Sequence, residues 1–323
     1  MSDTTASHTG AFSNRMTFAG AEVGDLNDLG DADVAIVGAP FDWGTTNRPG
    51  ARFGPRAIRA GDYLWTAASR PHLPTGIDPF QELDIVDIGD FDLVPGHIDE
   101  SIELIRRGVT RIAEQGTTPI VLGGDHSITF PNAGAVADIH GHGEVALIHF
   151  DAHADTAETH HGHLVGHGTP MRRLIESGAV PGHRFVQIGL RGYWPPPRIV
   201  EWMREQNMRS YLMTDIVERG LRSVVDEAVA YALDGASKAF ISVDIDVVDP
   251  GMAPGTGTPE PGGLTSRELL DTVRRIAREF DVVGADVVEV SPPYDGPGEI
   301  TALLANRVVL EILNGIAERK VGI

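Results

Sequence analysis

The stretch "EVALIHFDAHAD", residues 144–155, decides the fold class of this chain. Its first part, 144–151, is a nearly continuous apolar run, which is typical of a parallel strand that helices cover on both faces. Its second part places Asp151, His153 and Asp155 at every second position. Side chains two residues apart in an extended segment project to the same side. The pattern therefore predicts a buried strand that ends in a row of metal-binding groups.

The same alternation of β-rich runs and helical patterns continues along the chain. We predict strands at 33–40, 83–90, 118–125, 144–151, 184–190, 209–214, 238–246 and 281–290. We predict helices, from apolar residues at helical spacing, at 100–115, 169–178, 221–233 and 265–280. Repeated strand–helix–strand units indicate a three-layer α/β/α fold with a mostly parallel central sheet.

Two short motifs predict where helices begin. Thr265 and Glu268 have the spacing of a capping box at the start of the last predicted helix. The segment "GARFGPRAIR" (50–59) is read as a helix start with proline near the first position.

The composition predicts one domain without membrane or disulfide features. Of 323 residues, 41% are apolar and 22% charged, as in ordinary globular proteins. We expect an N-terminal arm over 1–32 and a single domain over 33–323. No apolar stretch is expected to reach membrane-spanning length, and the first residues lack the features of a signal peptide, so a cytoplasmic location is expected. The absence of cysteine excludes disulfides, thiolate nucleophiles and cysteine-based zinc sites.

The net charge of −20 bears on the partners of the protein. It argues against nucleic acid and anionic membranes, and it would favour a cationic substrate through long-range attraction. A merely solvated acidic surface explains the charge equally well, so charge supports a substrate hypothesis without generating one.

Metal-binding residue types follow four of the predicted strands. They are His126 after 118–125, Asp151, His153 and Asp155 after 144–151, Asp244 and Asp246 at the end of 238–246, and Glu289 near the end of 281–290. Ligands of open parallel sheets bind at the carboxyl ends of the strands, so these groups are expected to converge. A single Asp after a strand is usually a cap, and that reading is kept for Asp125. Several acids gathered in one cleft would be costly without cations.

The residue types also indicate the metal. Four carboxylates and two imidazoles, namely Asp151, Asp155, Asp244, Asp246, His126 and His153, are too rich in oxygen for a typical zinc site. They contain too much histidine for calcium or magnesium. Two Mn²⁺ ions fit best, with Co²⁺, Ni²⁺ or Fe²⁺ as substitutes.

Three motifs in order give the chain a family resemblance. "GGDHS" (123–127), "DAHAD" (151–155) and "SVDIDVVDPGMAPGTGTPEPGG" (242–263) resemble the ureohydrolases, binuclear manganese enzymes that include arginase and agmatinase. The similarity extends over roughly residues 33–315. Family members cleave guanidino groups and release urea.

The resemblance implies a role for each matching residue. One ion would be held by His126, Asp151, Asp155 and Asp244, and the other by Asp151, His153, Asp244 and Asp246. Glu289 matches the glutamate that binds the guanidinium, and Thr258 the threonine that orients it. His167 matches the histidine that carries protons to the leaving amine, and Asp155 is counted with the catalytic groups as well as with the ligands.

The resemblance leaves the substrate less well defined. Arginase binds the amino-acid end of its substrate with residues that are missing from two loops of this chain, "TAETHHGHLVGHG" (156–168) and "GLRGYWPPP" (189–197). The chain therefore looks like the agmatinase branch. Agmatine, giving putrescine and urea, is the first expectation. Guanidinobutyrase, guanidinopropionase and proclavaminate amidinohydrolase activities are alternatives, and a formiminoglutamase or a non-catalytic metal-bearing scaffold is more distant.

Particular residues bear on that choice and on assembly. A distal carboxylate would need an inward-facing Arg48 or Arg191, whereas Tyr193 and Trp194 either line a channel for an aliphatic spacer or pack the surface. By analogy with the family we expect a homo-oligomer, a trimer or a hexamer.

Overall fold

One parallel sheet organises the protein. The computed structural model describes residues 16–64 and 69–323. The strands in these ranges are β1 (Glu22–Val23), β2 (Val34–Ala39), β3 (Ile85–Asp90), β4 (Thr118–Gly123), β5 (Val145–Phe150), β6 (Phe185–Leu190), β7 (Arg209–Leu212), β8 (Lys238–Asp244) and β9 (Asp281–Val288). They pair in the order β1-β3-β2-β4-β9-β8-β5-β6-β7, and every pairing is parallel.

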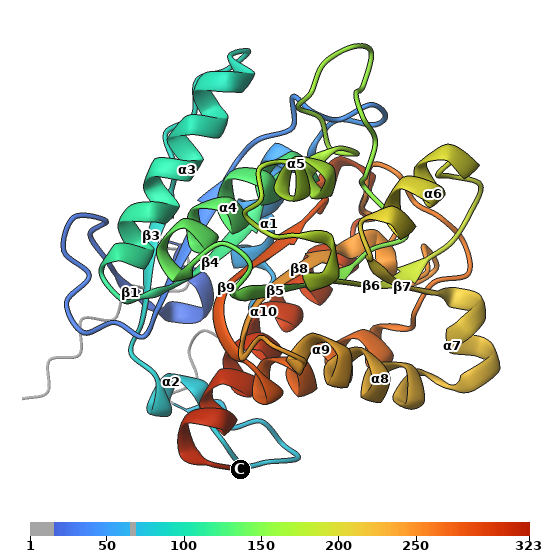
Figure 1. The fold of residues 1–323 in the computed structure, drawn as a ribbon. Coiled ribbons are helices and arrows are strands. Elements are labelled where there is room, and N and C mark those ends of the chain that lie inside the picture. The colour runs from blue at the N-terminus through green and yellow to red at the C-terminus, as the bar shows by residue number, and fades with distance from the viewer. Residues whose placement is uncertain (1–15, 65–68) are drawn as a thin grey trace, which may run out of the picture.

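Helices cover both faces of this sheet, as predicted. They are α1 (Gly54–Ala60), α2 (Pro79–Glu82), α3 (Ile98–Glu114), α4 (Thr129–His140), α5 (Pro170–Glu176), α6 (Pro197–Glu205), α7 (Met213–Arg219), α8 (Leu221–Leu233), α9 (Ser266–Glu279) and α10 (Ile300–Val321). Helices α8, α9 and α10 lie on one face, and α3, α4 and α5 lie on the other (Figure 1). The α/β/α fold class is therefore confirmed.

Burial on both faces explains the continuous apolar runs. In β2, Val34 and Ile36 belong to the core on the α10 side, whereas Ala35 and Val37 belong to the core on the α3 side. Because side chains alternate along a strand, a strand between two helix layers needs apolar residues at every position.

All eight predicted strands are present, and each of their ends differs from the prediction by at most two residues. The predicted segment 209–214 stops at Leu212, because α7 begins at Met213. The two-residue strand β1 was not predicted, and it pairs with β3. Residues 1–15 of the expected arm lie outside the described residues. Phe18 of the described part is fully buried, and the division at residue 32 stays a prediction.

The four predicted helices correspond to α3, α5, α8 and α9. The capping box of α9 is confirmed: Thr265 Oγ1 accepts the Glu268 backbone N–H, and the Glu268 carboxylate accepts the Thr265 N–H. Helix α1 carries proline in its first turn, as its sequence indicated.

Helix α10 corrects the expectation about apolar length. It is long and apolar enough to span a membrane by length and composition alone. However, 67% of its most apolar window is buried inside the protein, where the helix packs against α9 and α1. Apolar residues surround nearly its whole circumference because it is a core helix, and a helix of this kind lacks the one-sided pattern used for prediction.

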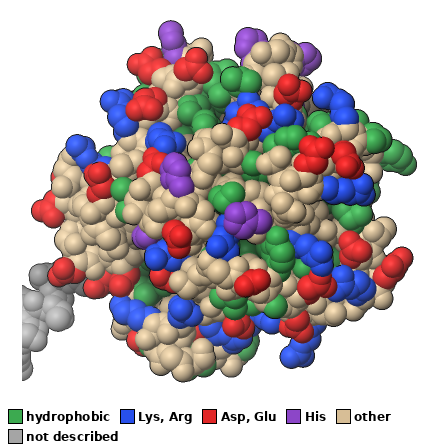
Figure 2. All heavy atoms as spheres, viewed as in Figure 1, with side chains coloured by type: hydrophobic (Ala, Val, Ile, Leu, Met, Phe, Trp, Pro, Cys, Tyr) green, Lys and Arg blue, Asp and Glu red, His purple; other side chains and the backbone are tan. Residues whose placement is uncertain are grey.

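The strand order brings the ends of distant segments together. Strands β4, β9, β8 and β5 are consecutive neighbours in the middle of the sheet, although they come from positions 118 to 288 of the chain. Their carboxyl ends therefore lie side by side. The face drawn in Figure 2 carries interspersed acidic and basic side chains.

Candidate metal centre and active site

His126 lies at the centre of a group of carboxylates. It opens a 3₁₀ turn directly after β4, and its ring is fully buried. Its Nδ1 atom lies 3.2 Å from an oxygen of Asp151, 3.0 Å from Asp155 and 3.2 Å from Asp244. None of the three contacts has hydrogen-bond geometry, so a buried ring nitrogen faces three carboxylates without a partner. The structure thus brings together the four residues predicted for the first ion.

A second group adjoins the first through Asp151. His153 Nδ1 lies 3.4 Å from Asp151 Oδ1 and 3.0 Å from Asp246 Oδ2. Asp151 therefore faces His126 with one oxygen and His153 with the other, as a bridging ligand would. Asp244 also accepts the Asp246 backbone N–H on its Oδ1, which makes it the cap of the 3₁₀ turn Ile245–Val247.

Protonation indicates that these groups need positive charge. Burial lowers the pKa of His126, but the carboxylates of Asp151, Asp155 and Asp244 close to its ring raise that pKa well above its ordinary value. Burial and the neighbouring carboxylates of Asp246 and Asp151 raise the pKa of Asp244. In the metal-free protein, protons on these buried acids and imidazoles offset the negative charge that metal cations would otherwise offset. The site contains as many carboxylate and imidazole ligands as two divalent ions need.

Glu289 and His167 form a buried pair beside this centre. Glu289 Oε1 accepts the His126 backbone N–H at 3.0 Å and lies 3.0 Å from His167 Nδ1. Burial lowers the pKa of His167, but the carboxylates of Glu289, Asp125 and Asp155 together raise it to about 9. The Glu289 N–H donates to the carbonyl of Gly124, where a Cβ atom would lie 1.9 Å from the Phe41 carbonyl oxygen. Gly124 therefore permits the close approach of the Phe41 backbone, while its carbonyl holds the Glu289 backbone.

Two of these residues have unusual backbone conformations. Asp155 has φ +50° and Glu289 has φ +62°. A residue with a side chain is strained in this region by on the order of 1–3 kcal/mol. Such strain is found chiefly at functional sites, and the one-letter sequence gives no sign of it.

A cavity of about 180 Å³ connects the groups. Its lining residues are Thr46, His153, Asp155, His160, His167, Gly168, Trp194, Asp244 and Thr258. Thr258 donates to Asp246 Oδ2 at 3.3 Å, so it joins the cavity to the second group. Every residue predicted for the site either lines this cavity or contacts a residue that does.

Thr46 and His160 are cavity residues to which the sequence interpretation gave no role. The Thr46 hydroxyl lies 2.7 Å from His167 Nε2. Its loop is held by Asp125, whose Oδ2 accepts the Gly44 N–H, while its Oδ1 accepts the Ser127 N–H. Asp125 is thus the cap that was expected, and it also fixes a loop 80 residues away. No local pattern indicates a contact of that kind.

The two candidate arginines have different environments. The Arg191 guanidinium donates to backbone carbonyls of three segments, including those of Gly189, Asp246 and Glu260, so it is fully engaged by the protein. Arg48 is exposed, with its guanidinium carbon 5.5 Å from the Tyr294 ring centre. Of the aromatic pair, Trp194 lines the cavity, whereas Tyr193 is fully exposed.

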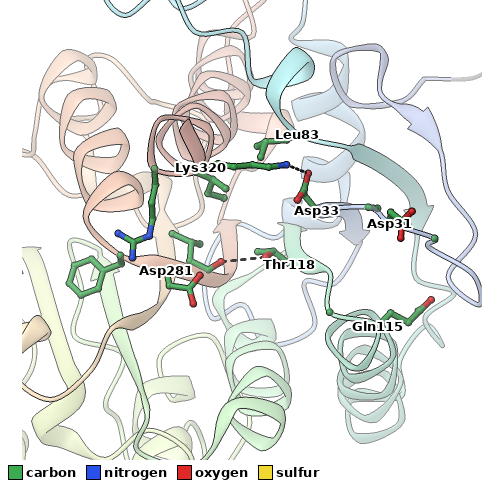
Figure 3. Close-up of a pocket in the computed structure, with 14 residues that line it drawn as sticks. Asp31, Asp33, Leu83, Gln115, Thr118, Asp281 and Lys320 are labelled. Atoms are coloured by element: carbon green, nitrogen blue, oxygen red, sulfur yellow. Dashed lines mark hydrogen bonds and ion pairs between the residues drawn. The ribbon is translucent and has the colours of Figure 1, made fainter. Parts of the chain in front are cut away.

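A larger cavity, of about 560 Å³, lies at the opposite edge of the sheet. It is lined by residues at the amino ends of β2, β4 and β9, and Lys320 and Asp33 of this lining form an ion pair at 2.8 Å (Figure 3). Ligands of parallel sheets bind at the other edge, outside the carboxyl ends of the strands. We assign it no role in the chemistry.

Comparisons with known proteins identify similar chains. A family model described as "Arginase family" matches residues 32–314. The chain is 41% identical to a mitochondrial agmatinase of Gallus gallus, over 87% of this chain and 80% of that protein. It is 39% identical to a guanidinobutyrase of Pseudomonas aeruginosa, over 90% of each.

Solved structures agree with these matches. The proclavaminate amidino hydrolase of Streptomyces clavuligerus superposes with a TM-score of 0.86 at 36% identity, covering 95% of this chain and 99% of that one. A variant of a Trypanosoma cruzi formiminoglutamase, described with Mn²⁺, superposes with a TM-score of 0.79 at 26% identity, covering 90% of this chain and 94% of that one.

Proposed function

Because the chain belongs to the arginase family and is a hydrolase of C–N bonds in linear amidines, we propose that its site releases urea from agmatine with the help of two Mn²⁺ ions. One observation carries the proposal: the unpartnered His126 Nδ1 faces three carboxylate oxygens at 3.0–3.2 Å. A site of this composition has no evident purpose other than holding cations.

The ligands divide into two sets that share residues. His126, Asp151, Asp155 and Asp244 would hold one ion, and Asp151, His153, Asp244 and Asp246 would hold the other. Asp151 supports this division best, because its two oxygens face different histidines. Two bound divalent ions would supply Lewis acidity and activate water at neutral pH.

Glu289 is the group proposed to bind the guanidinium. A planar guanidinium pairs with a carboxylate through two parallel hydrogen bonds, which fix its plane as well as its position. One oxygen of Glu289 is used by His126 N–H and His167, and the other lies toward Gly257, next to Thr258. Thr258, hydrogen-bonded to Asp246, would orient the substrate against the ligand groups.

His167 is proposed to supply the proton that the leaving amine requires. An amine leaves poorly unless it is protonated, and imidazole is the side chain suited to that transfer. The carboxylates of Glu289, Asp125 and Asp155 raise the pKa of His167 to about 9, which favours the protonated ring that this transfer needs. His167 lines the cavity and is therefore accessible to substrate.

An amine-ended substrate is favoured by the residues around the cavity. The described lining residues include no arginine or lysine, and burial lowers the pKa of His160, so that ring adds little positive charge near neutrality. Arg191 is occupied by backbone carbonyls. A distal carboxylate would lose its hydration without gaining a cationic partner.

A guanidino acid such as 4-guanidinobutyrate is the second candidate. Two observations favour it: the similarity to a guanidinobutyrase, and the exposed Arg48 two residues from Thr46 in the loop beside the cavity. In that case Arg48 would hold the substrate carboxylate.

One panel of substrates tests the two candidates. Urea release is measured after manganese loading with agmatine, 4-guanidinobutyrate, 3-guanidinopropionate and arginine. We expect the highest kcat/KM for agmatine and no change in it upon Arg48→Ala. A higher kcat/KM for 4-guanidinobutyrate, lost in Arg48→Ala, would replace agmatine with the acid. Urea from none of the four would contradict the proposed function.

A further inference from the structure

A row of buried polar side chains crosses the sheet one step behind the proposed ligands. Strand register places them next to one another on five adjacent strands, in the order Ser210, Gln187, His149, Ser242 and Asp286. Gln187, His149, Ser242 and Asp286 are fully buried. Buried polar groups in the middle of a sheet are costly unless each is hydrogen-bonded, so a row of them requires an explanation.

The row makes direct contact with the ligand groups at two points. His149 Nε2 lies 2.8 Å from Asp151 Oδ2, and Ser242 Oγ lies 3.0 Å from His126 Nε2. Asp286 at the end of the row accepts hydrogen bonds from Thr129 and Asn132 of α4. The residues behind the site are therefore linked to one ligand of each chemical type, an aspartate and a histidine.

The hydrogen bonds of Gln187 determine which nitrogen of His149 carries the proton. The amide nitrogen lies 2.9 Å from the carbonyl of Ala154, which can only accept, and the amide oxygen accepts the Ser210 hydroxyl at 2.8 Å. The amide is thus fixed in one orientation. Its second N–H points at His149 Nδ1, 3.0 Å away, so Nδ1 accepts and the proton lies on Nε2.

This proton position excludes His149 as a metal ligand. His126, His149 and Asp151 lie close enough together to be counted as a possible metal group. A ring nitrogen that binds a metal needs a free lone pair, and here Nε2 is protonated and directed at Asp151. His149 therefore donates to a ligand and does not act as one.

We propose that His149, oriented by Gln187 and Ser210, is a positioning residue that holds Asp151 in the conformation needed to bind both ions. The inference rests on the proposed metal centre and adds a role for residues outside it. Hydrogen-bond partners of this kind fix the orientation of a carboxylate and limit its rotation. Asp151 is the ligand for which this matters most, because its two oxygens serve two different histidine groups.

Two variants that differ by one methylene test the proposal. In His149→Gln the amide can donate to Asp151 from near the Nε2 position, whereas in His149→Asn the side chain reaches only the Nδ1 position. Metal-free proteins are titrated with MnCl₂, and the free ion is measured by its EPR signal. We expect His149→Asn to weaken manganese binding about 10–100-fold and His149→Gln to weaken it much less.

Further readouts separate positioning from folding. At saturating manganese we expect kcat of His149→Asn to recover with KM unchanged. Thr117→Val, which alters an equally buried polar residue at the amino end of β4, should bind manganese like the unmodified protein. If His149→Asn does not fold, Gln187→Met carries the test: weaker manganese binding supports the proposal, and unchanged binding overturns it.

The possible failures are distinguishable. Unchanged manganese affinity in His149→Asn, or equal losses in both His149 variants, would overturn the positioning role while leaving the metal centre intact. If the unmodified protein itself binds no manganese, the proposed function fails first.

Discussion

Asp151 and His126 belong to the same cluster, but they differ in the number of proposed metal ions that each would bind. Asp151 faces both histidine groups, whereas the His126 ring faces only the first. We expect Asp151→Asn to lower kcat at saturating manganese by more than about 100-fold, since even partners outside the ligand set cost 10–100-fold. His126→Asn should be partly restored by excess metal. Activity measured as a function of manganese concentration tests both variants. Equal losses of kcat in the two variants that excess manganese does not relieve would contradict the larger role of Asp151.

The pairing of His167 with Glu289 predicts how activity depends on pH. The pKa of His167 is raised to about 9, so the ring is protonated below that pH and loses its proton above it. A catalytic acid works only while protonated, and we expect kcat/KM to fall above about pH 9. His167→Asn should lower kcat by about 10²–10⁴-fold and remove this alkaline limb. An alkaline limb that persists in the variant would assign it to another group.

Residue types and spacing were enough to predict which side chains converge at the site, but not the groups behind them. The i, i+2 pattern that joins Asp151 to His153 also includes His149, one step earlier in "HFDAHAD", so this residue could have been found. Its partners could not: Gln187 and Ser242 become its neighbours only through strand register. The strained backbone of Asp155 and Glu289 likewise depends on tertiary structure.

Among the elements, strands were easier to predict than helices, for a physical reason. A strand between two helix layers is apolar throughout, and such short runs separated by turns are easily recognised. Helices α3 and α9 bury one side and show a clear period, whereas α4 and α10 are buried almost all round. A helix without a polar face gives no amphipathic signal, so both were missed. Helices α2, α6 and α7 were also missed, and each of them is shorter than ten residues.

Arg191 stabilises the packing between three segments of the fold. Its guanidinium joins the end of β6 to the turn after β8 and to the loop at 260. Lysine cannot make these forked contacts, and we expect Arg191→Lys to lower stability by about 3 kcal/mol. The ratio of kcat/KM for 4-guanidinobutyrate and agmatine should not change. A selective loss of the acid substrate would show that Arg191 reads a carboxylate after all.

At the scale of the whole molecule, we predict the oligomeric state. The family analogy predicts a homo-oligomer, a trimer or a hexamer, in solution. Light scattering at several protein concentrations measures the mass directly against the 34.6 kDa of one chain. A constant monomer mass would contradict this expectation.

The stability of the whole fold should depend on the metal ions that we propose for the site. Asp151, Asp244, Asp246 and Glu289 are buried within one cavity region, and their charges repel one another unless cations lie between them. Ions that bind only the folded state stabilise it by about 2.7 kcal/mol each at a hundredfold excess over Kd. For two ions in a chain of this size, we expect manganese to raise the melting temperature by on the order of 10 °C relative to protein treated with EDTA.

A matched pair of variants assigns that rise to the proposed site. Asp151→Asn should lose most of it, because the carboxylate that faces both groups is gone. Thr265→Ala, which removes only the cap of α9, should cost about 1 kcal/mol with or without metal and keep the full rise. Calorimetry of the three proteins, each with manganese and with EDTA, makes the comparison. A rise that survives in Asp151→Asn would place the stabilising ions elsewhere, since the folded state gains stability only from sites that the unfolded chain cannot form.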